Sequence, residues 1–138
     1  MTHCTLCHLP PVFSDTLFHN MGVGSDKTPA DPGRGKVLAD QAKAAGKPAP
    51  PEAETLIGAF KTGSLRGLML RAPYFHDGRA KTYDLAAATM LAGGIANPHK
   101  DDKLKKWEFT EEQKTLLLAF LRSISPSNSS PYVRPGLP

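Results

Sequence analysis

Cys4-Thr5-Leu6-Cys7-His8 stands near the start of the 138-residue chain and contains its only two cysteines. Two thiols at this spacing can each form a thioether with a vinyl group of one haem, and the histidine that follows can then bind the iron. A zinc site would need a second Cys or His pair at metal spacing, and a redox dithiol would need a strand–helix–strand context. Neither follows, so apart from a chance C-x-x-C the motif predicts one covalent haem c held by Cys4, Cys7 and His8.

The composition is compatible with a single globular domain built around such a group. The chain is 40% hydrophobic and 22% charged, and its 13 Pro and 12 Gly predict short helices joined by long loops. The formal charge of +4 fits a basic surface, or one that attracts an acidic redox partner. A role in nucleic-acid binding is disfavoured, because basic runs do not interleave with aromatic residues. No stretch has the length of a transmembrane helix.

Four segments have helical patterns: residues 36–45, 52–57, 82–92 and 110–124. Thr82 is the expected N-cap of the third, and Thr110 with Gln113 forms a capping box for the fourth. The fourth helix should present an apolar side made of Leu116, Leu117, Phe120, Leu121 and Ile124. The tail at 126–138 is rich in Pro and Ser, and we expect it to be extended or partly disordered. The haem domain therefore spans residues 1–125.

Several residues outside the first motif could serve the haem. Met90 lies with Tyr83, Ala86 and Ala87 on one helical face, where it could reach the iron, although spacing alone favours a core role. His19 and Met21 are possible ligands as well, but they lie close to the attachment site in sequence.

A second group of candidates concerns charge. The two haem propionates need cationic partners, and Arg66 is the candidate, with an ordinary surface arginine as the alternative.

Further stretches extend the pattern along the chain: Phe18-His19-Asn20-x-Gly22-Val23, Asp31-Pro32-Gly33-Arg34, Phe60-Lys61-Thr62-x-Ser64-Leu65-Arg66, Ala72-Pro73-Tyr74-Phe75-His76-Asp77-Gly78 and Asn97-Pro98-His99. With the first motif and the last helix, they resemble the C-terminal haem domain of the bacterial di-haem cytochrome c peroxidase family, which includes the MauG-type enzymes. The resemblance covers nearly all of residues 4–125.

This resemblance implies an all-α, cytochrome c-like fold with long loops around one haem c. It implies that His8 is the proximal ligand and that Met90, fourteen residues after His76, is the distal ligand; peroxidases of the family carry Met there and MauG-type enzymes carry Tyr. Three features depart from the family. The N-terminal domain is absent, the segment between Arg34 and Phe60 is longer, and Arg71 replaces a residue that helps to hold calcium, so no calcium is expected.

Two functions compete on this basis. The first is a c-type electron-transfer domain whose His8/Met90 ligation leaves no open iron site. The second is the electron-accepting part of a di-haem peroxidase or MauG-like oxidase whose catalytic haem lies on another segment. Whether the chain is itself an enzyme stays open, with an electron carrier favoured.

The expected partners are a redox protein, acidic by charge complementarity, or other haem subunits. Haem attachment of this type implies a periplasmic or other extracytoplasmic location, although only three residues precede Cys4 and an export signal is not among them.

Overall fold

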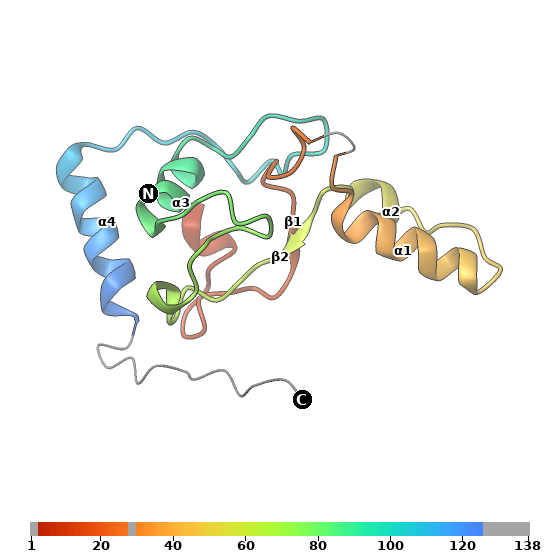
Figure 1. The fold of residues 1–138 in the computed structure, drawn as a ribbon, viewed down its shortest axis with the longest axis horizontal. Helices are drawn as coiled ribbons and strands as arrows, with labels where there is room; N and C mark the ends of the chain where they lie inside the picture. Colours follow the sequence, from red (N-terminus) through yellow and green to blue (C-terminus); the bar gives the residue numbers. More distant parts are fainter. Residues whose placement is uncertain (1–2, 28–29, 126–138) are drawn as a thin grey trace.

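The computed structural model describes residues 3–27 and 30–125, so the expected tail at 126–138 lies outside the described residues. The elements in chain order are the 3-10 helix η1 (His3–Leu6), β1 (Phe18–His19), α1 (Gly33–Ala44), α2 (Glu52–Thr55), β2 (Phe60–Lys61), the 3-10 helix η2 (Leu68–Leu70), α3 (Tyr83–Leu91) and α4 (Glu111–Ser123). Long loops join short helices, as the Pro and Gly content predicted (Figure 1). In the described part of the chain no helix has the length and apolar character needed to cross a membrane.

The starts of α3 and α4 confirm the expected caps. The Leu85 amide donates to Thr82 Oγ1 at 3.4 Å. At α4 the Gln113 amide donates to Thr110 Oγ1 at 3.2 Å, and the Thr110 amide donates to Gln113 Oε1 at 3.0 Å. These reciprocal bonds satisfy two amides that have no partner within the helix, which fixes where α4 begins.

The structure is rich in helices, as expected, and it also contains two short strands. β1 and β2 form a two-residue antiparallel ladder, in which Phe18 faces Lys61 and His19 faces Phe60. The Thr62 amide extends the pairing by donating to the Leu17 carbonyl at 2.8 Å. Such a ladder has no sequence period to reveal it, because it is shorter than one alternation of apolar and polar residues. It holds the segment after the attachment motif against residues 60–62.

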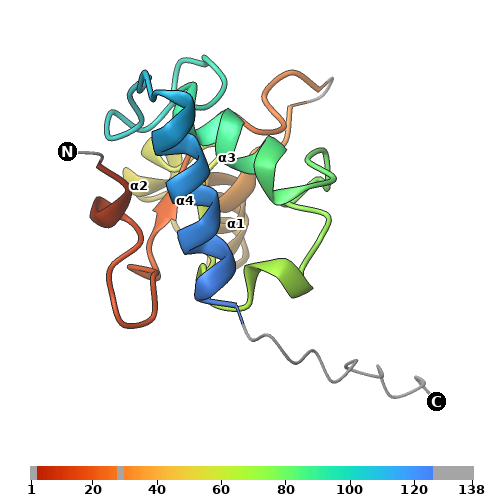
Figure 2. The same ribbon diagram turned by 90° about the vertical axis from the view of Figure 1, so that its left-hand side faces the viewer.

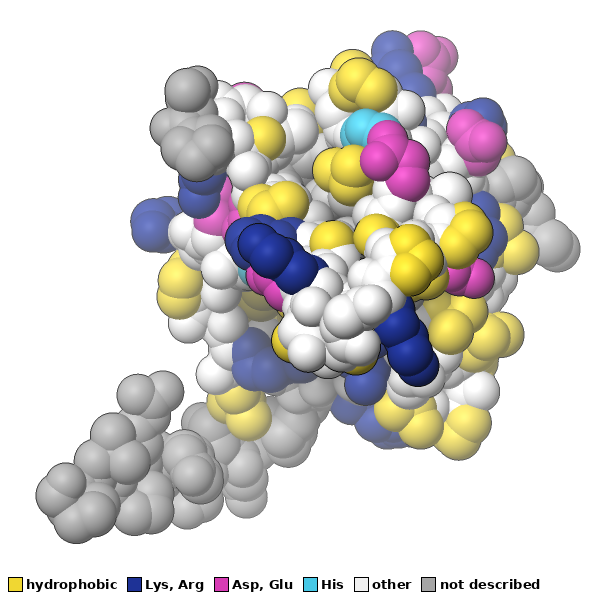
Figure 3. All heavy atoms as spheres, turned by 90° about the vertical axis from the view of Figure 1, so that its right-hand side faces the viewer, with side chains coloured by type: hydrophobic (Ala, Val, Ile, Leu, Met, Phe, Trp, Pro, Cys, Tyr) yellow, Lys and Arg dark blue, Asp and Glu magenta, His cyan; other side chains and the backbone are white. Residues whose placement is uncertain are grey.

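Helices α1 and α2 pack on each other and project from the body of the molecule (Figure 1). Their close approach depends on Gly35, where an added Cβ would lie 2.4 Å from the Ala53 carbonyl oxygen. Helix α1 begins at Gly33, three residues before the expected start, and α2 ends at Thr55 rather than at residue 57. Figure 3 shows acidic, basic and apolar side chains interspersed over this end of the molecule, so it offers no continuous face of one charge.

The protein core is small for a chain of this length. The buried hydrophobic residues are Val23, Ala53, Ala59, Tyr74, Ala80 and Leu121, and among the described residues no large side chain is fully enclosed. Of the expected apolar side of α4, only Leu121 is buried; Leu116 is 63% exposed and Phe120 is 44% exposed. Much apolar surface near α4 is therefore not covered by the described residues of the chain.

The element that begins the attachment motif and the helix that carries Met90 lie on the same side of α4 in Figure 1. In the view of Figure 2, α4 runs down the front of the molecule, with η1 to its left and α3 to its right.

Candidate haem site

The attachment motif folds as a tight turn. The amides of Cys7 and His8 both donate to the Cys4 carbonyl, at 3.3 and 2.8 Å. Both cysteines are free, with Cys4 exposed and Cys7 half-buried. Burial is the main cause that raises the pKa of the Cys7 thiol, and the nearby Asp15 carboxylate adds to it. The turn thus presents two thiols and one imidazole within five residues, as covalent attachment requires.

His8 has the hydrogen bonding expected of a metal ligand. Its Nδ1 lies 2.9 Å from the Phe13 carbonyl oxygen, which can only accept, so Nδ1 carries the proton. Burial lowers the pKa of His8 and favours the neutral ring, more than the Phe13 carbonyl opposes it. A neutral imidazole with Nδ1–H held by a backbone carbonyl leaves the Nε2 lone pair available to a metal.

Arg66 lies against the loop that follows the motif. Its Nε donates to the Pro11 carbonyl at 2.5 Å, and its guanidinium carbon lies 5.3 Å from the centre of the Phe13 ring. The same two loops are joined by Ser64 Oγ, which donates to the Val12 carbonyl at 2.5 Å. The structure therefore brings Arg66 to the attachment loop, although its side chain is exposed.

Met90 lies near the end of α3, on the face that the helical period predicted. Tyr83, Ala86, Ala87 and Met90 are all half-buried, whereas Asp84, Leu85 and Ala88 are exposed. The end of α3 is held firmly, because the Trp107 amide donates to the Leu91 carbonyl at 2.8 Å and Lys100 Nζ donates to the Gly93 carbonyl at 3.0 Å. Met90 is carried by α3 and His8 directly follows η1, and these two elements appear on either side of α4 in the view of Figure 2.

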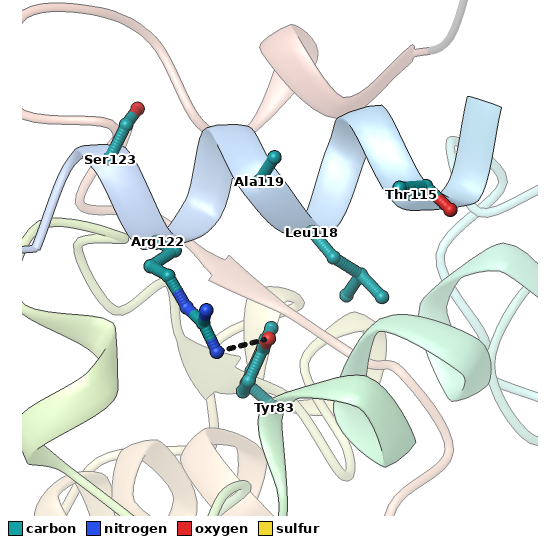
Figure 4. Close-up of a pocket in the computed structure, with 6 residues that line it drawn as sticks. All are labelled: Tyr83, Thr115, Leu118, Ala119, Arg122 and Ser123. Atoms are coloured by element: carbon teal, nitrogen blue, oxygen red, sulfur yellow. Dashed lines mark hydrogen bonds between the residues drawn. The ribbon is translucent and has the colours of Figure 1, made fainter. Parts of the chain in front are cut away.

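Two hollows flank α4, and neither is lined by the attachment motif or by Met90. One has a volume of about 470 Å³ and lies between α4 and Tyr83, where Arg122 Nη2 donates to the Tyr83 hydroxyl at 3.5 Å (Figure 4). Figure 4 also shows Leu118 pointing from α4 toward the α3 side of this hollow. The other, of about 560 Å³, is lined mainly by apolar residues, among them Trp107, Phe109, Leu116 and Phe120.

His19 makes contacts that the sequence did not reveal. Its Nε2 lies 2.8 Å from Asp15 Oδ2, and its Nδ1 lies 2.5 Å from Asp101 Oδ2. Both ring nitrogens are therefore engaged, which is incompatible with the idea that His19 binds the iron. Asp101 is 82 residues away in the chain, so no local pattern could have indicated this contact.

The same region contains a grouping that could hold an ion. A ligand atom from each of Cys7, Asp15 and His19 lies within 4.8 Å of the others. In the structure His19 already uses both nitrogens on carboxylates, and Cys7 belongs to the attachment motif. This grouping is better explained as part of the support of the attachment turn than as a separate metal centre.

The residues present fit a c-type haem on three independent observations. The motif offers two free thiols on one turn, and His8 is held as a neutral donor. Large apolar side chains close to the motif, Leu6, Leu9, Val12 and Leu17, are each about half exposed, as are Leu116 and Phe120 on α4. Apolar side chains exposed to this degree are available to contact the faces of a bound haem.

Comparison with known proteins agrees with this interpretation. MauG of Methylorubrum extorquens, described as a methylamine utilization protein, is 33% identical over 121 residues, which are 88% of this chain and 30% of that protein. The cytochrome-c peroxidase IdrP1 of Denitromonas iodatirespirans is 39% identical over 82 residues, covering 59% of this chain and 22% of that protein. Cytochrome c551 peroxidase of Nitrosomonas europaea is 30% identical over 124 residues, covering 88% and 30%. No protein-family model matches the chain.

A solved structure shows the same likeness in three dimensions. The crystal structure of a MauG-like protein associated with microbial copper homeostasis superposes with a TM-score of 0.65 at 25% identity, over 94% of this chain and 45% of that one. The fold and the site thus define a haem-based redox protein whose cofactor is of the c type. Its relatives are MauG and the cytochrome c peroxidases, and the resemblance to that family is confirmed. The chain spans only 22–30% of the three named relatives.

Proposed function

We propose that the chain is an electron-transfer domain with one covalent haem c, bound through Cys4 and Cys7 and ligated by His8 and Met90. The observation that carries the proposal is the His8 hydrogen bond to the Phe13 carbonyl, which leaves Nε2 free for iron. Met90 is supported by its place on the half-buried face of α3. In the view of Figure 2, α3 and η1 appear on either side of α4. Haem c supplies an iron that exchanges one electron between Fe(II) and Fe(III).

The residues of the chain control that exchange in three ways. The Phe13 carbonyl orients the His8 ring and raises its basicity. A thioether from Met90 would favour the reduced iron and would leave no open position for peroxide, which suits a carrier rather than a peroxide-reacting centre. Arg66 is placed to offset propionate charge beside the attachment loop. The working location is periplasmic, and the partner is a redox protein or another haem subunit.

A second function is favoured by one observation. Because the chain spans less than a third of the three named relatives, it corresponds to one part of a peroxidase or MauG-like oxidase, with the peroxide-reacting haem on another segment. In that setting the domain accepts electrons and passes them on. A second C-x-x-C-H upstream in the full-length gene would support this function, and peroxide turnover by the present chain alone would contradict the electron-carrier proposal.

The cofactor proposal is tested by attachment. Denatured protein should keep its Soret absorbance and give the pyridine haemochrome spectrum of haem c, at one haem per chain. Replacing either Cys4 or Cys7 with Ala should weaken or abolish attachment, because each supplies one thioether. Haem that extracts into acidified organic solvent from the native protein would refute covalent binding.

The ligand proposal is tested by Met90→Ala. The native oxidised protein should be low-spin and show the weak sulfur-to-iron band at the red end of the spectrum. The variant should lose that band, bind cyanide and have a lower reduction potential, while its haem stays attached. Met21→Ala is the matched control, because Met21 is also half-buried and is the other methionine near the site. A native protein that is high-spin and reacts quickly with peroxide would show that Met90 is not the ligand.

A further inference from the structure

The stretch His19-Asn20-Met21 lies along the loop that follows α3. The Ile95 amide donates to the Met21 carbonyl at 2.9 Å, and the Asp101 amide donates to the Asn20 carbonyl at 3.0 Å. The His19 ring adds its 2.5 Å contact with the Asp101 carboxylate. Three successive residues therefore bind one loop, and that loop begins directly after the helix that carries Met90.

Buried Asn20 reinforces this contact. Its side chain is 5% exposed, and its Nδ2 donates to the Ile57 carbonyl at 2.7 Å and to Asn97 Oδ1 at 3.2 Å. Asn97 donates back from its Nδ2 to Asn20 Oδ1 at 3.2 Å. The two side-chain amides thus hydrogen-bond to each other in both directions. The 19–21 stretch and the loop are therefore joined by side-chain as well as backbone hydrogen bonds.

The other side of His19 faces the attachment turn. Its Nε2 contacts Asp15 Oδ2 at 2.8 Å, and the Asp15 amide donates to the Cys7 carbonyl at 2.7 Å. A continuous series of hydrogen bonds therefore runs from Cys7 through Asp15 and His19 to Asp101. It joins the segment that carries one proposed iron ligand to the loop behind the other.

Burial and ionised carboxylates strengthen the hydrogen bonds of this series. The side chains of Asp15, His19 and Asp101 are only 7%, 10% and 20% exposed. Although burial opposes ionisation, the bond to His19 holds the pKa of Asp15 down to about 2, and the same pairing lowers that of Asp101. Each His19 nitrogen lies within hydrogen-bond distance of one carboxylate. Without the ring, the Oδ2 atoms of Asp15 and Asp101 would both lose this partner, and each carboxylate would keep the backbone amide that donates to its Oδ1.

We propose that His19 is a positioning residue that sets the separation between the attachment turn and the loop behind Met90, and so holds the Met90 sulfur on the iron. The inference rests on the proposed His8/Met90 ligation. It assigns no chemical step to His19, which acts through the two segments that it joins.

The test is His19→Gln in the haem-loaded protein. The glutamine amide carries its donors on a single nitrogen and cannot reach both carboxylates in this geometry, so the bridge between Asp15 and Asp101 should be lost and the loop behind Met90 should move relative to the attachment turn. The sulfur-to-iron band should be lost or much weakened, and cyanide should bind at least tenfold faster, with haem attachment and helix content retained. His19→Arg, which offers donors to both carboxylates, should recover part of the band. His99→Gln makes the same chemical change within the same loop and is the control that should leave the band intact.

The outcomes separate this inference from the proposed function. If Met90→Ala abolishes the band while His19→Gln keeps it and binds cyanide at the native rate, the ligation stands and the positioning role is wrong. If the native protein lacks the band, both are wrong. If His19→Gln does not fold, Asp101→Asn provides the test instead. This variant keeps the contact between His19 and Asp15 but weakens the contact between His19 and residue 101 of the loop. An unchanged band and cyanide rate in that variant would overturn the inference.

Discussion

Gly22 allows the 19–21 stretch and the loop behind Met90 to come together. Its φ angle is +79°, and an added Cβ would lie 1.9 Å from the Ile95 carbonyl oxygen and 2.8 Å from Ile95 Cβ. The atoms in the way include backbone, which cannot turn aside as a flexible side chain could. We therefore predict that Gly22→Ala separates the stretch from the loop.

The size of the effect follows from two contributions. A left-handed conformation costs a residue with a Cβ about 1–2 kcal/mol. Non-bonded atoms pack best at about 3.5 Å, so the two backbones must move apart by roughly 1.5 Å. Such a movement breaks the bond from the Ile95 amide to the Met21 carbonyl and costs about 1 kcal/mol or more. The expected loss in free energy of unfolding is about 2–3 kcal/mol, against a typical total of about 5–15 kcal/mol.

Gly46→Ala is the matched control. Gly46 has a φ of +65°, but an added Cβ there would meet nothing within 4 Å, so only the conformational cost of about 1–2 kcal/mol applies. Denaturant unfolding of the haem-loaded proteins, followed by far-ultraviolet circular dichroism, gives both values. A loss at Gly22 no larger than that at Gly46 would refute the close-approach argument.

Three further predictions concern separate parts of the molecule. Arg66→Ala should lower the reduction potential, because the oxidised iron loses a nearby positive charge; a titration that finds it unchanged would show that Arg66 serves only its bond to Pro11. The pKa of Asp77 is held to about 2, because its pairing with Arg79 at 2.8 Å outweighs the effect of burial. A lowered folded-state pKa stabilises the protein above about pH 4, and this contribution, about 1 kcal/mol after solvent screening, is lost as pH falls toward 2. Unfolding curves of Asp77→Asn and the native protein should therefore converge at low pH, and a constant gap between them would contradict this. Thr110→Ala should lower the free energy of unfolding by about 1 kcal/mol through loss of the cap of α4, measured by thermal melting; no change would mean that the α4 cap contributes nothing.

Local chemistry could be predicted from the sequence where neighbours in the chain decide it. Thr110 and Gln113 are three residues apart, so their capping box was visible as a pattern and is confirmed. The half-buried face of α3 followed in the same way from a 3.6-residue period. The attachment motif needed only five adjacent residues, and the structure folds them as a turn. The ligand role of Met90 stays a prediction, because it depends on where α3 stands relative to η1.

Contacts between distant segments could not be predicted in this way. His19 looked like a candidate iron ligand because its sequence neighbours do not reveal Asp101, which approaches from 82 residues away. The exposure of Leu116 and Phe120 was missed for a related reason. A helical period shows which residues share a side, but it does not show what covers that side.

The α1–α2 projection has a consequence for how proteins of this kind can diverge. Its two ends meet at one base, where the Arg34 amide donates to the Ala59 carbonyl at 2.8 Å and the Gly58 amide donates to the Pro32 carbonyl at 2.9 Å. Insertions or deletions beyond that base would change the length of the projection without moving β1, β2 or the attachment turn. The Ile57 carbonyl, which accepts from buried Asn20 at 2.7 Å, limits such changes, so variation in length is expected at the far end of the projection, away from this contact.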